Sequence, residues 1–250
     1  MRVDLKSHLA FLLFVAPLLL AGCQPAEQQA AKFDGEMVLA ISWQAGFCET
    51  RPRLPECRSQ TDQRFDANHF ALHGLWPQPR SEAYCDVPQS QVDLSKQRRW
   101  SRLGGLGLPE DMQLDLLRVM PGARSFLHRH EWVKHGTCYS RNAETYYRDS
   151  LALMAAINAS SVQDLFANNI GKKLTTRQIR AEFDKAFGRG VGNRIRVSCV
   201  KDGKRQLIKE LTLGMNGVVG STPDLKRLTR WSRSTKPGCP GGLVDPVGLQ

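Results

Sequence analysis

The segment from residue 125 to 138 holds the densest cluster of titratable side chains in the sequence, SFLHRHEWVKHGTC. His130, Glu131, Lys134 and His135 all fall within it. Histidine changes its charge near neutral pH, and a carboxylate or an ammonium beside it shifts its pKa. Such a cluster is suited to general acid and general base catalysis.

The same segment is predicted to form a helix. Ser125 follows a Pro-Gly turn and can act as the N-cap, and Gly136 is placed as the left-handed residue that ends the helix. At about 100° of rotation per residue, Trp132 and Val133 fall on the arc opposite the titratable cluster and can face a core.

Two i,i+4 pairs lie on the titratable side of this predicted helix. His130 is paired with Lys134, and Glu131 is paired with His135. Each histidine therefore has a charged neighbour that can set its orientation or its pKa.

A zinc site is the main alternative chemistry for this segment. The His-Glu pair begins a metalloprotease signature, but that signature requires its second histidine four residues after the first. Position 134 is lysine, and His135 follows His130 by five positions. A rotation of about 140° between the two imidazoles, with an ammonium beside them, disfavours a divalent metal. A solvated polar face is the other alternative, but it does not explain the histidine density.

Residues 1–22 are predicted to be a secretion signal, because basic residues precede an apolar run from Leu9 to Ala21 that is too short to span a bilayer. The string Leu20-Ala-Gly-Cys23 looks like a bacterial lipobox, which implies cleavage before Cys23 and a lipid on its thiol. Gln24 would then permit delivery to the outer membrane. We expect a periplasm-facing lipoprotein of the bacterial envelope; the alternative is an ordinary signal peptide with an incidental cysteine.

Beyond the signal, residues 23–36 are predicted to be a flexible tether, and residues 37–250 a single domain. The full chain has a formal net charge of +11, from 35 Lys and Arg against 24 Asp and Glu. Such a basic chain favours a polyanionic partner, either nucleic acid or an anionic membrane surface.

Six cysteines remain when Cys23 is assigned to a lipid: Cys48, Cys57, Cys85, Cys138, Cys199 and Cys239. An even number fits an oxidising compartment and a fold that is stapled by disulfides. Six cysteines allow about 15 connectivities, so their pairing is open at this point.

The order of predicted elements indicates an α+β fold. Strands are expected at 37–43, 68–77, 195–199 and 206–213, and helices at 109–119, 144–159, 161–169 and 176–187. The strands flank a block of helices, without the regular alternation of a doubly wound fold. His73 lies near the end of the second strand, which Gly74 and Pro77 are expected to halt.

Two motifs taken together resemble one family. His73-Gly-Leu-Trp-Pro77, followed by His130-Glu-Trp-Val-Lys-His-Gly-Thr-Cys138, is similar to the pair of active-site segments of the ribonuclease T2 family. Leu39–Trp43 and the cysteine after it also resemble the first strand of that family. The resemblance implies a single α+β domain, an antiparallel sheet packed by helices, in which the two histidine segments meet across a cleft.

The resemblance also implies a reaction: endonucleolytic cleavage of single-stranded RNA to 2′,3′-cyclic phosphate ends, then hydrolysis to 3′-phosphates, with no metal or cofactor. His135 would be the general base and His73 the general acid. His130 would bind phosphate, while Lys134 and Glu131 would stabilise the transition state. The rival function is a non-catalytic envelope lipoprotein of the same fold that binds RNA or another polyanion. We expect a monomer.

Disulfides Cys85–Cys138 and Cys199–Cys239 are also implied by the resemblance, which leaves Cys48–Cys57 as the third. Trp76 would offer a face on which an unpaired base could stack, with a core position as the alternative for it and for Tyr84.

Two basic runs, residues 96–102 and 226–233, each contain a tryptophan and could track an RNA backbone, although a solvated surface is the favoured reading for either run alone. His69 and His128 are assigned structural roles.

Overall fold

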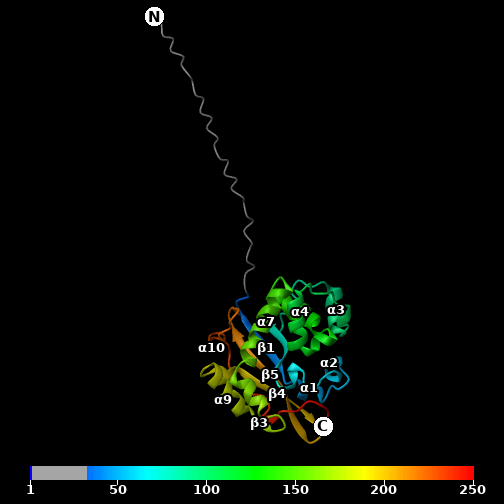
Figure 1. Cartoon of the computed structure of the whole chain (residues 1–250), viewed down its shortest axis with the longest axis vertical. Helices are drawn as coiled ribbons and strands as arrows, with labels where there is room; N and C mark the ends of the chain where they lie inside the picture. The colour runs from blue at the N-terminus through cyan, green and yellow to red at the C-terminus, as the bar shows by residue number, and fades with distance from the viewer. Residues whose placement is uncertain (2–32) are drawn as a thin grey trace.

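The computed structural model describes Met1 and residues 33–250, which form the domain drawn in colour in Figure 1. The signal peptide predicted at residues 1–22, the lipidation site Cys23 and the tether as far as residue 32 lie outside the described residues, Met1 excepted. Within the described part, no helix is long and apolar enough to cross a bilayer.

The folded domain starts within the predicted tether. Phe33 stacks on Tyr139 with ring centroids 4.9 Å apart, and the carbonyl of Gly35 accepts a hydrogen bond from the N–H of Gly217. Residues 33–36 therefore pack on the domain, which extends further toward the N-terminus than the boundary expected at residue 37.

A six-stranded sheet forms the centre of the fold (Figure 1). Its strands are β1 (Glu36–Ser42), β2 (Ala71–Pro77), β3 (Lys173–Thr175), β4 (Ile195–Asp202), β5 (Arg205–Asn216) and β6 (Gly241–Leu243). The order is β2-β1-β5-β6-β3, and β4 also pairs with β5. Every ladder is antiparallel except β5–β6. The fold class is the predicted α+β, with a mixed sheet in place of a wholly antiparallel one.

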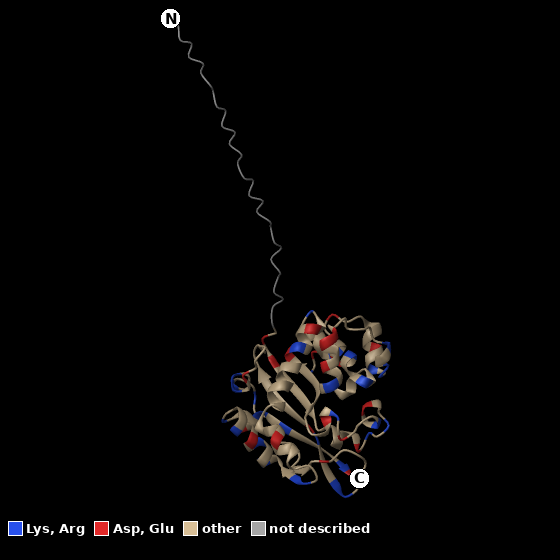
Figure 2. Ribbon diagram, viewed as in Figure 1, with Lys and Arg blue, Asp and Glu red and all other residues tan. Residues whose placement is uncertain are grey.

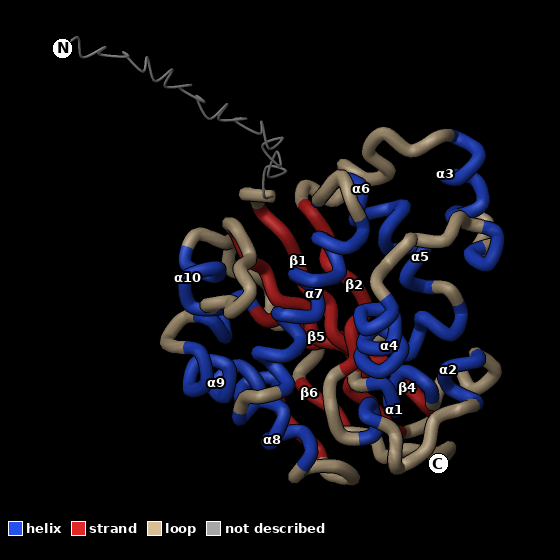
Figure 3. Tube along the Cα trace, turned by 45° about the horizontal axis from the view of Figure 1, so that its top comes forward, coloured by secondary structure: helices blue, strands red, loops and turns tan. Residues whose placement is uncertain are grey.

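The helices are α1 (Gln44–Cys48), α2 (Pro55–Arg58), α3 (Gln89–Lys96), α4 (Glu110–Val119), α5 (Leu127–Glu131), α6 (Thr137–Tyr139), α7 (Ala143–Asn158), α8 (Ser161–Ala167), α9 (Thr176–Phe187) and α10 (Leu225–Arg230). Short 3₁₀ turns occur at Phe65–Ala67, Trp100–Arg102, Pro121–Ser125 and Val191–Arg194. In Figure 3, α7, α8 and α9 lie over the sheet, and α3, α4 and α5 gather on the β2 side of the molecule.

The core lies between the sheet and these helices, and its largest buried side chains include Trp43, Phe70, Tyr146, Tyr147 and Phe166. Tyr146 also forms hydrogen bonds with the backbone of β2. Its hydroxyl donates to the carbonyl of Leu75 at 2.9 Å and accepts from the N–H of Leu75 at 3.1 Å. Because β2 is an edge strand, Leu75 has both backbone groups free on that side. The two bonds therefore hold the middle of β2 against α7.

The predicted helices are present as α4, α7, α8 and α9. Thr175 caps α9 in a capping box with Gln178. The strands expected at 195–199 and 206–213 are also present, but each is longer, because pairing across the turn at Gly203 continues to the ends of β4 and β5. The three-residue strands β3 and β6 were not predicted from the sequence.

Candidate active site

The predicted helix at 125–138 is built from three pieces. α5 runs from Leu127 to Glu131, a π-helix spans Trp132–Gly136, and α6 follows. The N-cap prediction for Ser125 is wrong: Phe126, with φ of 63°, precedes α5, and the hydroxyl of Ser125 donates to the carboxylate of Glu56 instead. A left-handed residue between the 3₁₀ turn and α5 changes the direction of the chain at this point.

Gly136 does not end the helix as predicted. Its φ of −62° is right-handed, and the chain continues into α6. A Cβ at this position would lie 2.3 Å from the Trp132 ring, so the ring occupies the space that a side chain would need. Glycine is therefore required here by close packing and not by a turn.

The π-helix accounts for the five-residue spacing between His130 and His135. Its hydrogen bonds join residues five apart, so its turn is wider than that of an α-helix. The rotation between the two imidazoles is therefore smaller than the 140° or so that α-helical geometry predicts. Both rings line one cavity, together with Glu131 and Lys134.

His73 reaches the same cavity from β2 through a β-bulge. Ala40 of β1 pairs with Gly74, and the next residue, Ile41, pairs with Leu72. His73 is therefore the extra residue, opposite no partner on β1. The strand was expected to be halted by Gly74 and Pro77. It passes Gly74 and ends at Pro77, so His73 lies inside the strand and not near its end.

The bulge decides where His73 points. In a regular strand, residues three apart face opposite sides of the sheet. His73 and Trp76 are three apart, yet both line the cavity. The inserted residue breaks the alternation and turns both side chains to one face, which is a common use of bulges beside functional sites.

The cavity holds about 440 Å³ between β2, α3 and the helix that contains the π-turn. It is lined by His73, Trp76, Arg80, Tyr84, Ser95, Lys96, Arg98, Trp100, Leu127, His130, Glu131, Lys134 and His135. All five residues to which the family resemblance assigns catalytic roles thus face one space.

The two principal histidines have opposite electrostatic environments. Burial alone would lower the pKa of His73, but the hydrogen bond to Glu210 and the charges of Glu131 and Glu210 outweigh it and raise the pKa above its ordinary value. The pKa of His135 is lowered to about 3, by burial first and then by the charge of Lys134 and other nearby cations. His73 therefore favours its protonated form and His135 its neutral form.

Glu210 is a site residue that the sequence reading missed. It lies on β5, and the Nδ1–H of His73 donates to its Oε2 at 2.7 Å. The available signal was a carboxylate inside a predicted strand, but its partner lies 137 residues away in the chain. Only the pairing of β1 with both β2 and β5 brings the two together.

Glu131 is buried and faces β2. It accepts a hydrogen bond from Nε1 of Trp76 at 2.8 Å, and its Oε1 lies 4.0 Å from Nε2 of His73. Burial raises the pKa of Glu131, against the opposing effects of His73, Trp76 and Lys134. The predicted pairing with His135 is thus replaced by contacts with Trp76 and His73, because the π-turn changes the register after Glu131.

Trp76 contacts both principal histidines. Its ring centroid lies 5.3 Å from that of His73, edge to face, and 5.6 Å from that of His135. With its indole N–H held by Glu131, Trp76 fixes the spacing of the two imidazoles.

His130 is positioned by the segment that contains the first basic run. Its Nδ1 shares a hydrogen bond of 2.7 Å with the hydroxyl of Ser95, and its ring stacks on Trp100 at 4.7 Å. Burial and then the charge of Lys134 lower the pKa of His130 to about 4. The run at 96–102 was read as a solvated surface, but Lys96, Arg98 and Trp100 line the cavity.

Three disulfides are formed: Cys48–Cys57, Cys85–Cys138 and Cys199–Cys239. This is the pairing that the family resemblance implied. Cys138 lies in α6, directly after the π-turn, and its bridge closes a separation of 53 residues. In the chain-entropy account, such a loop stabilises the fold by about 4 kcal/mol.

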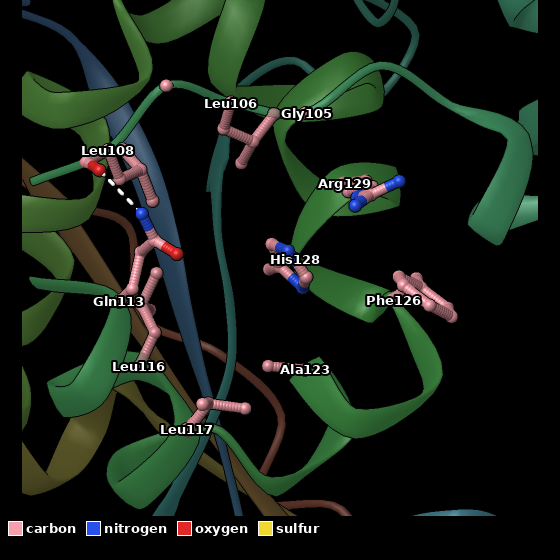
Figure 4. A pocket seen from close by; sticks show the side chains of 11 residues that line it. Gly105, Leu106, Leu108, Gln113, Leu116, Leu117, Ala123, Phe126, His128 and Arg129 are labelled. Carbon is pink, nitrogen blue, oxygen red and sulfur yellow. Dashed lines mark hydrogen bonds between the residues drawn. The ribbon is translucent and has the colours of Figure 1, made fainter. Parts of the chain in front are cut away.

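The other two assigned histidines lie outside the cavity. His69 stacks on Phe65 with centroids 4.1 Å apart. His128 lines a separate pocket of about 370 Å³ on the other side of α5, where burial lowers its pKa to about 4 (Figure 4). Among the described residues, no group of three or more His, Cys, Asp or Glu side chains is arranged to hold a metal ion.

Replacing Glu210 with glutamine is expected to move the basic limb of the pH profile to lower pH. The amide can still accept the hydrogen bond from His73, but the negative charge that helps to raise the pKa of His73 is lost. The measurement is kcat/KM for a dinucleotide substrate as a function of pH at constant ionic strength. The exposed Glu110→Gln variant is the control, and an unchanged basic limb in Glu210→Gln would contradict the role given to this carboxylate.

Comparisons with known proteins agree with this geometry. Residues 34–224 match the model of the Ribonuclease T2 family. Ribonuclease I of Escherichia coli strain K12 is 32% identical over 201 residues, which cover 69% of this chain and 72% of that protein. Extracellular ribonuclease LE of Solanum lycopersicum is 29% identical over 164 residues, 63% of this chain and 66% of that protein.

The fold has matches among solved structures. A mutant of ribonuclease MC1 in complex with 5′-UMP superposes with a TM-score of 0.54 at 15% identity, covering 85% of this chain and 99% of that one. The match to the family model covers most of the chain. It is a match of sequence, so it is independent of the likeness in fold. The chain belongs to the Ribonuclease T2 family.

Proposed function

We propose that this protein is an endoribonuclease that cleaves single-stranded RNA by transesterification, through a 2′,3′-cyclic phosphate that it then hydrolyses to a 3′-phosphate. Its family membership makes the protein a ribonuclease. The observation that carries the reaction type is the opposite pKa shift of two histidines that line one cavity.

In the first step, neutral His135 takes the proton of the 2′-hydroxyl, and the 2′-oxygen attacks the adjacent phosphorus. The bond to the 5′-oxygen breaks, and protonated His73 gives its proton to that leaving oxygen. Each proton transfer of this kind contributes a factor of about 10² to 10⁴ in rate. In the second step the roles exchange: His73 activates water, and His135 protonates the departing 2′-oxygen.

In the transition state, extra negative charge develops on the non-bridging oxygens of the phosphate, where a cation and a hydrogen-bond donor of the cavity wall can stabilise it. Lys134 supplies a charge that needs no proton transfer, and His130, held by Ser95 and Trp100, is placed to donate to a phosphate oxygen. Glu131 orients His73 and Trp76 from the opposite wall.

Unpaired bases have aromatic surfaces available in the same cavity. Tyr84, Trp76 and Trp100 all line it, and base stacking on such rings is worth about 1–3 kcal/mol per base. Trp76 and Trp100 already contact histidines, and Tyr84 is the one of these three rings that packs on no other aromatic side chain of the described residues. Single-stranded RNA is the substrate class that such an arrangement favours.

The test is to incubate protein that lacks residues 1–23 with single-stranded RNA in excess EDTA and to identify the product ends. Cyclic phosphate and 3′-phosphate ends are expected. Ends with a 5′-phosphate would indicate metal-type hydrolysis and would refute this mechanism. RNA binding without cleavage would instead favour the non-catalytic alternative.

We also propose that the protein is a lipoprotein of the bacterial envelope, anchored through Cys23 and exposed to the periplasm. The support is the Leu20-Ala-Gly-Cys23 string after an apolar run, together with three disulfides, which form in oxidising compartments. Gln24 favours the outer membrane as the destination. Mass spectrometry of the mature N-terminus tests this proposal, and an unmodified Cys23 would exclude the anchor.

A further inference from the structure

The second basic run, residues 226–233, is not part of the catalytic cavity. Most of the run lies in α10. The two leucines of this helix, Leu225 and Leu228, are buried, whereas Lys226, Arg227 and Arg230 are exposed. In Figure 2, blue segments mark the side of the molecule on which Figure 1 places α9 and α10.

The three exposed cations of α10 line a hollow of about 430 Å³. Its cationic side chains are Arg189, Arg194, Lys226, Arg227 and Arg230, and we call it the distal basic pocket. The acidic side chain on its wall is Asp224, whose carboxylate caps α10 by accepting from the N–H of Arg227. Within residues 33–250, no carboxylate oxygen lies within ion-pair distance of any of the five cations.

The five cations differ in their side-chain hydrogen bonds. Arg194 donates to the carbonyls of Ser232 and Gly190, and Arg227 donates to a backbone carbonyl as well. Across the described part of the chain, Arg189, Lys226 and Arg230 make no side-chain hydrogen bond. The guanidinium carbon of Arg230 lies 5.0 Å from the centroid of the Trp231 ring. A pocket with five cations and one acidic side chain is suited to an anionic ligand.

A groove of about 330 Å³ lies between the distal basic pocket and the catalytic cavity, and we call it the connecting groove. The acidic residue in its lining, Glu36, is paired with Arg233 at 3.5 Å. Arg80 lines both this groove and the catalytic cavity. Arg194 lines both this groove and the distal basic pocket. The two shared arginines make the three hollows neighbours in a row on the surface.

The register of the sheet places this path on one face. Trp76 of β2 is paired with Val38 of β1, and Val38 is paired with Gly214 of β5. Residues directly opposite in a ladder point to the same side of a sheet. Trp76 lines the catalytic cavity, and Val38 and Gly214 line the connecting groove. In Figure 3 the corresponding ends of β1 and β2 lie between α10 and α3.

We propose that a long single-stranded RNA continues from the catalytic cavity through the connecting groove and is held at the distal basic pocket by its phosphates. This inference rests on the proposed ribonuclease function. Trp231 is 72% exposed beside the pocket, and the ring face that Arg230 does not cover is available to a base. A cationic groove with aromatic side chains is the general design of surfaces that bind single strands without sequence preference.

An anionic membrane is the other polyanion that a basic surface with an exposed tryptophan can meet. The observations favour RNA, because the cations line recessed hollows that adjoin one another as far as the catalytic cavity. A flexible strand can follow such a path, whereas a bilayer meets only protruding groups.

The test is the triple variant Arg189→Ala, Lys226→Ala, Arg230→Ala. For a long unstructured RNA, kcat/KM is expected to fall by about 10- to 100-fold at moderate salt, and the slope of log affinity against log salt by about 0.7 for each cation removed. Cleavage of a dinucleotide, which is too short to leave the catalytic cavity, is expected to be unchanged. The matched control removes three exposed cations elsewhere, Arg53, Lys201 and Lys204.

A second variant blocks the path without changing charge. A Cβ at Gly214 would meet only atoms at 3.8 Å or beyond, so Gly214→Leu can place its side chain in the connecting groove. It is expected to weaken cleavage of the long RNA and to spare the dinucleotide, with circular dichroism as the check on folding.

Affinity for the long RNA is measured separately in a His135→Ala background, so that binding is tested whether or not the chain cleaves. Equal affinity in the triple variant and its control would overturn the inference. So would a triple variant that loses binding to anionic lipid vesicles but not to RNA. Failure of the unaltered protein to cleave either RNA, with the binding difference present, would refute the proposed function and leave the distal site supported.

Discussion

Replacing His73 with alanine is expected to lower kcat for RNA cleavage by about 10²- to 10⁴-fold, the usual contribution of one positioned proton donor. The leaving 5′-oxygen would then depart as an alkoxide or take its proton from water. His73 is partly exposed and packs against the edge of Trp76, so the truncation should leave the fold intact. The measurements are single-turnover cleavage of a dinucleotide and thermal unfolding of the variant.

A substrate with a better leaving group distinguishes the proposed general acid, His73, from the proposed general base, His135. A nucleoside 3′-phosphate nitrophenyl ester has a leaving group that needs no proton, so His73→Ala should regain most of its lost rate on this substrate. His135→Ala should not, because the 2′-hydroxyl must still be deprotonated. Recovery by His135→Ala in place of His73→Ala would show that the two roles are assigned the wrong way round.

Gly74→Ala is expected to lower activity by about 10²-fold, although it removes no ionisable group. A Cβ at this position would lie 2.1 Å from Oε2 of Glu131 and 2.6 Å from Nε1 of Trp76. Both atoms belong to buried or tightly held groups, so the methyl must displace the Glu131–Trp76 pair, and displacements of about 1 Å at an active site can cost this much in rate. Overpacking of this kind also costs about 1–3 kcal/mol of stability.

The measurements for Gly74→Ala are kcat for the dinucleotide and the free energy of unfolding in urea. Gly104→Ala is the matched control, because Gly104 is exposed and a Cβ there would meet no atom within 4 Å. Full activity in Gly74→Ala would mean that Glu131 can move without consequence, which would contradict its role in orienting His73.

The sequence was sufficient to predict the helices and strands whose signals come from residues near one another in the chain. α9 is marked by Thr175 and Gln178 at its start, and α4 by a proline before an amphipathic run. The two histidine motifs were sufficient to identify the family and to predict which histidines, together with Glu131 and Lys134, line one cavity. These features depend on neighbours in the chain or on a string of fixed spacing.

The parts that could not be predicted depend on distant partners. The π-turn at Trp132–Gly136 and the bulge at His73 each insert a residue into a regular pattern, and neither has a local sequence signal that differs from an ordinary helix or strand. Glu210 reaches His73 only through the order of strands in the sheet. Sequence periodicity assumes regular elements, and here the reactive groups lie at the two irregularities.

The contact of Trp76 with both imidazoles also bears on how the enzyme returns to its starting state. Within the described residues no hydrogen bond joins His73 to His135, and each ring packs against the indole instead. A proton gained by one histidine therefore has no direct internal route to the other. In the proposed mechanism, transesterification inverts the two protonation states, which are restored either by hydrolysis of the cyclic phosphate or by exchange with solvent. A cyclic product that dissociates early thus leaves an enzyme whose recovery depends on buffer, and turnover should rise with buffer concentration at constant pH.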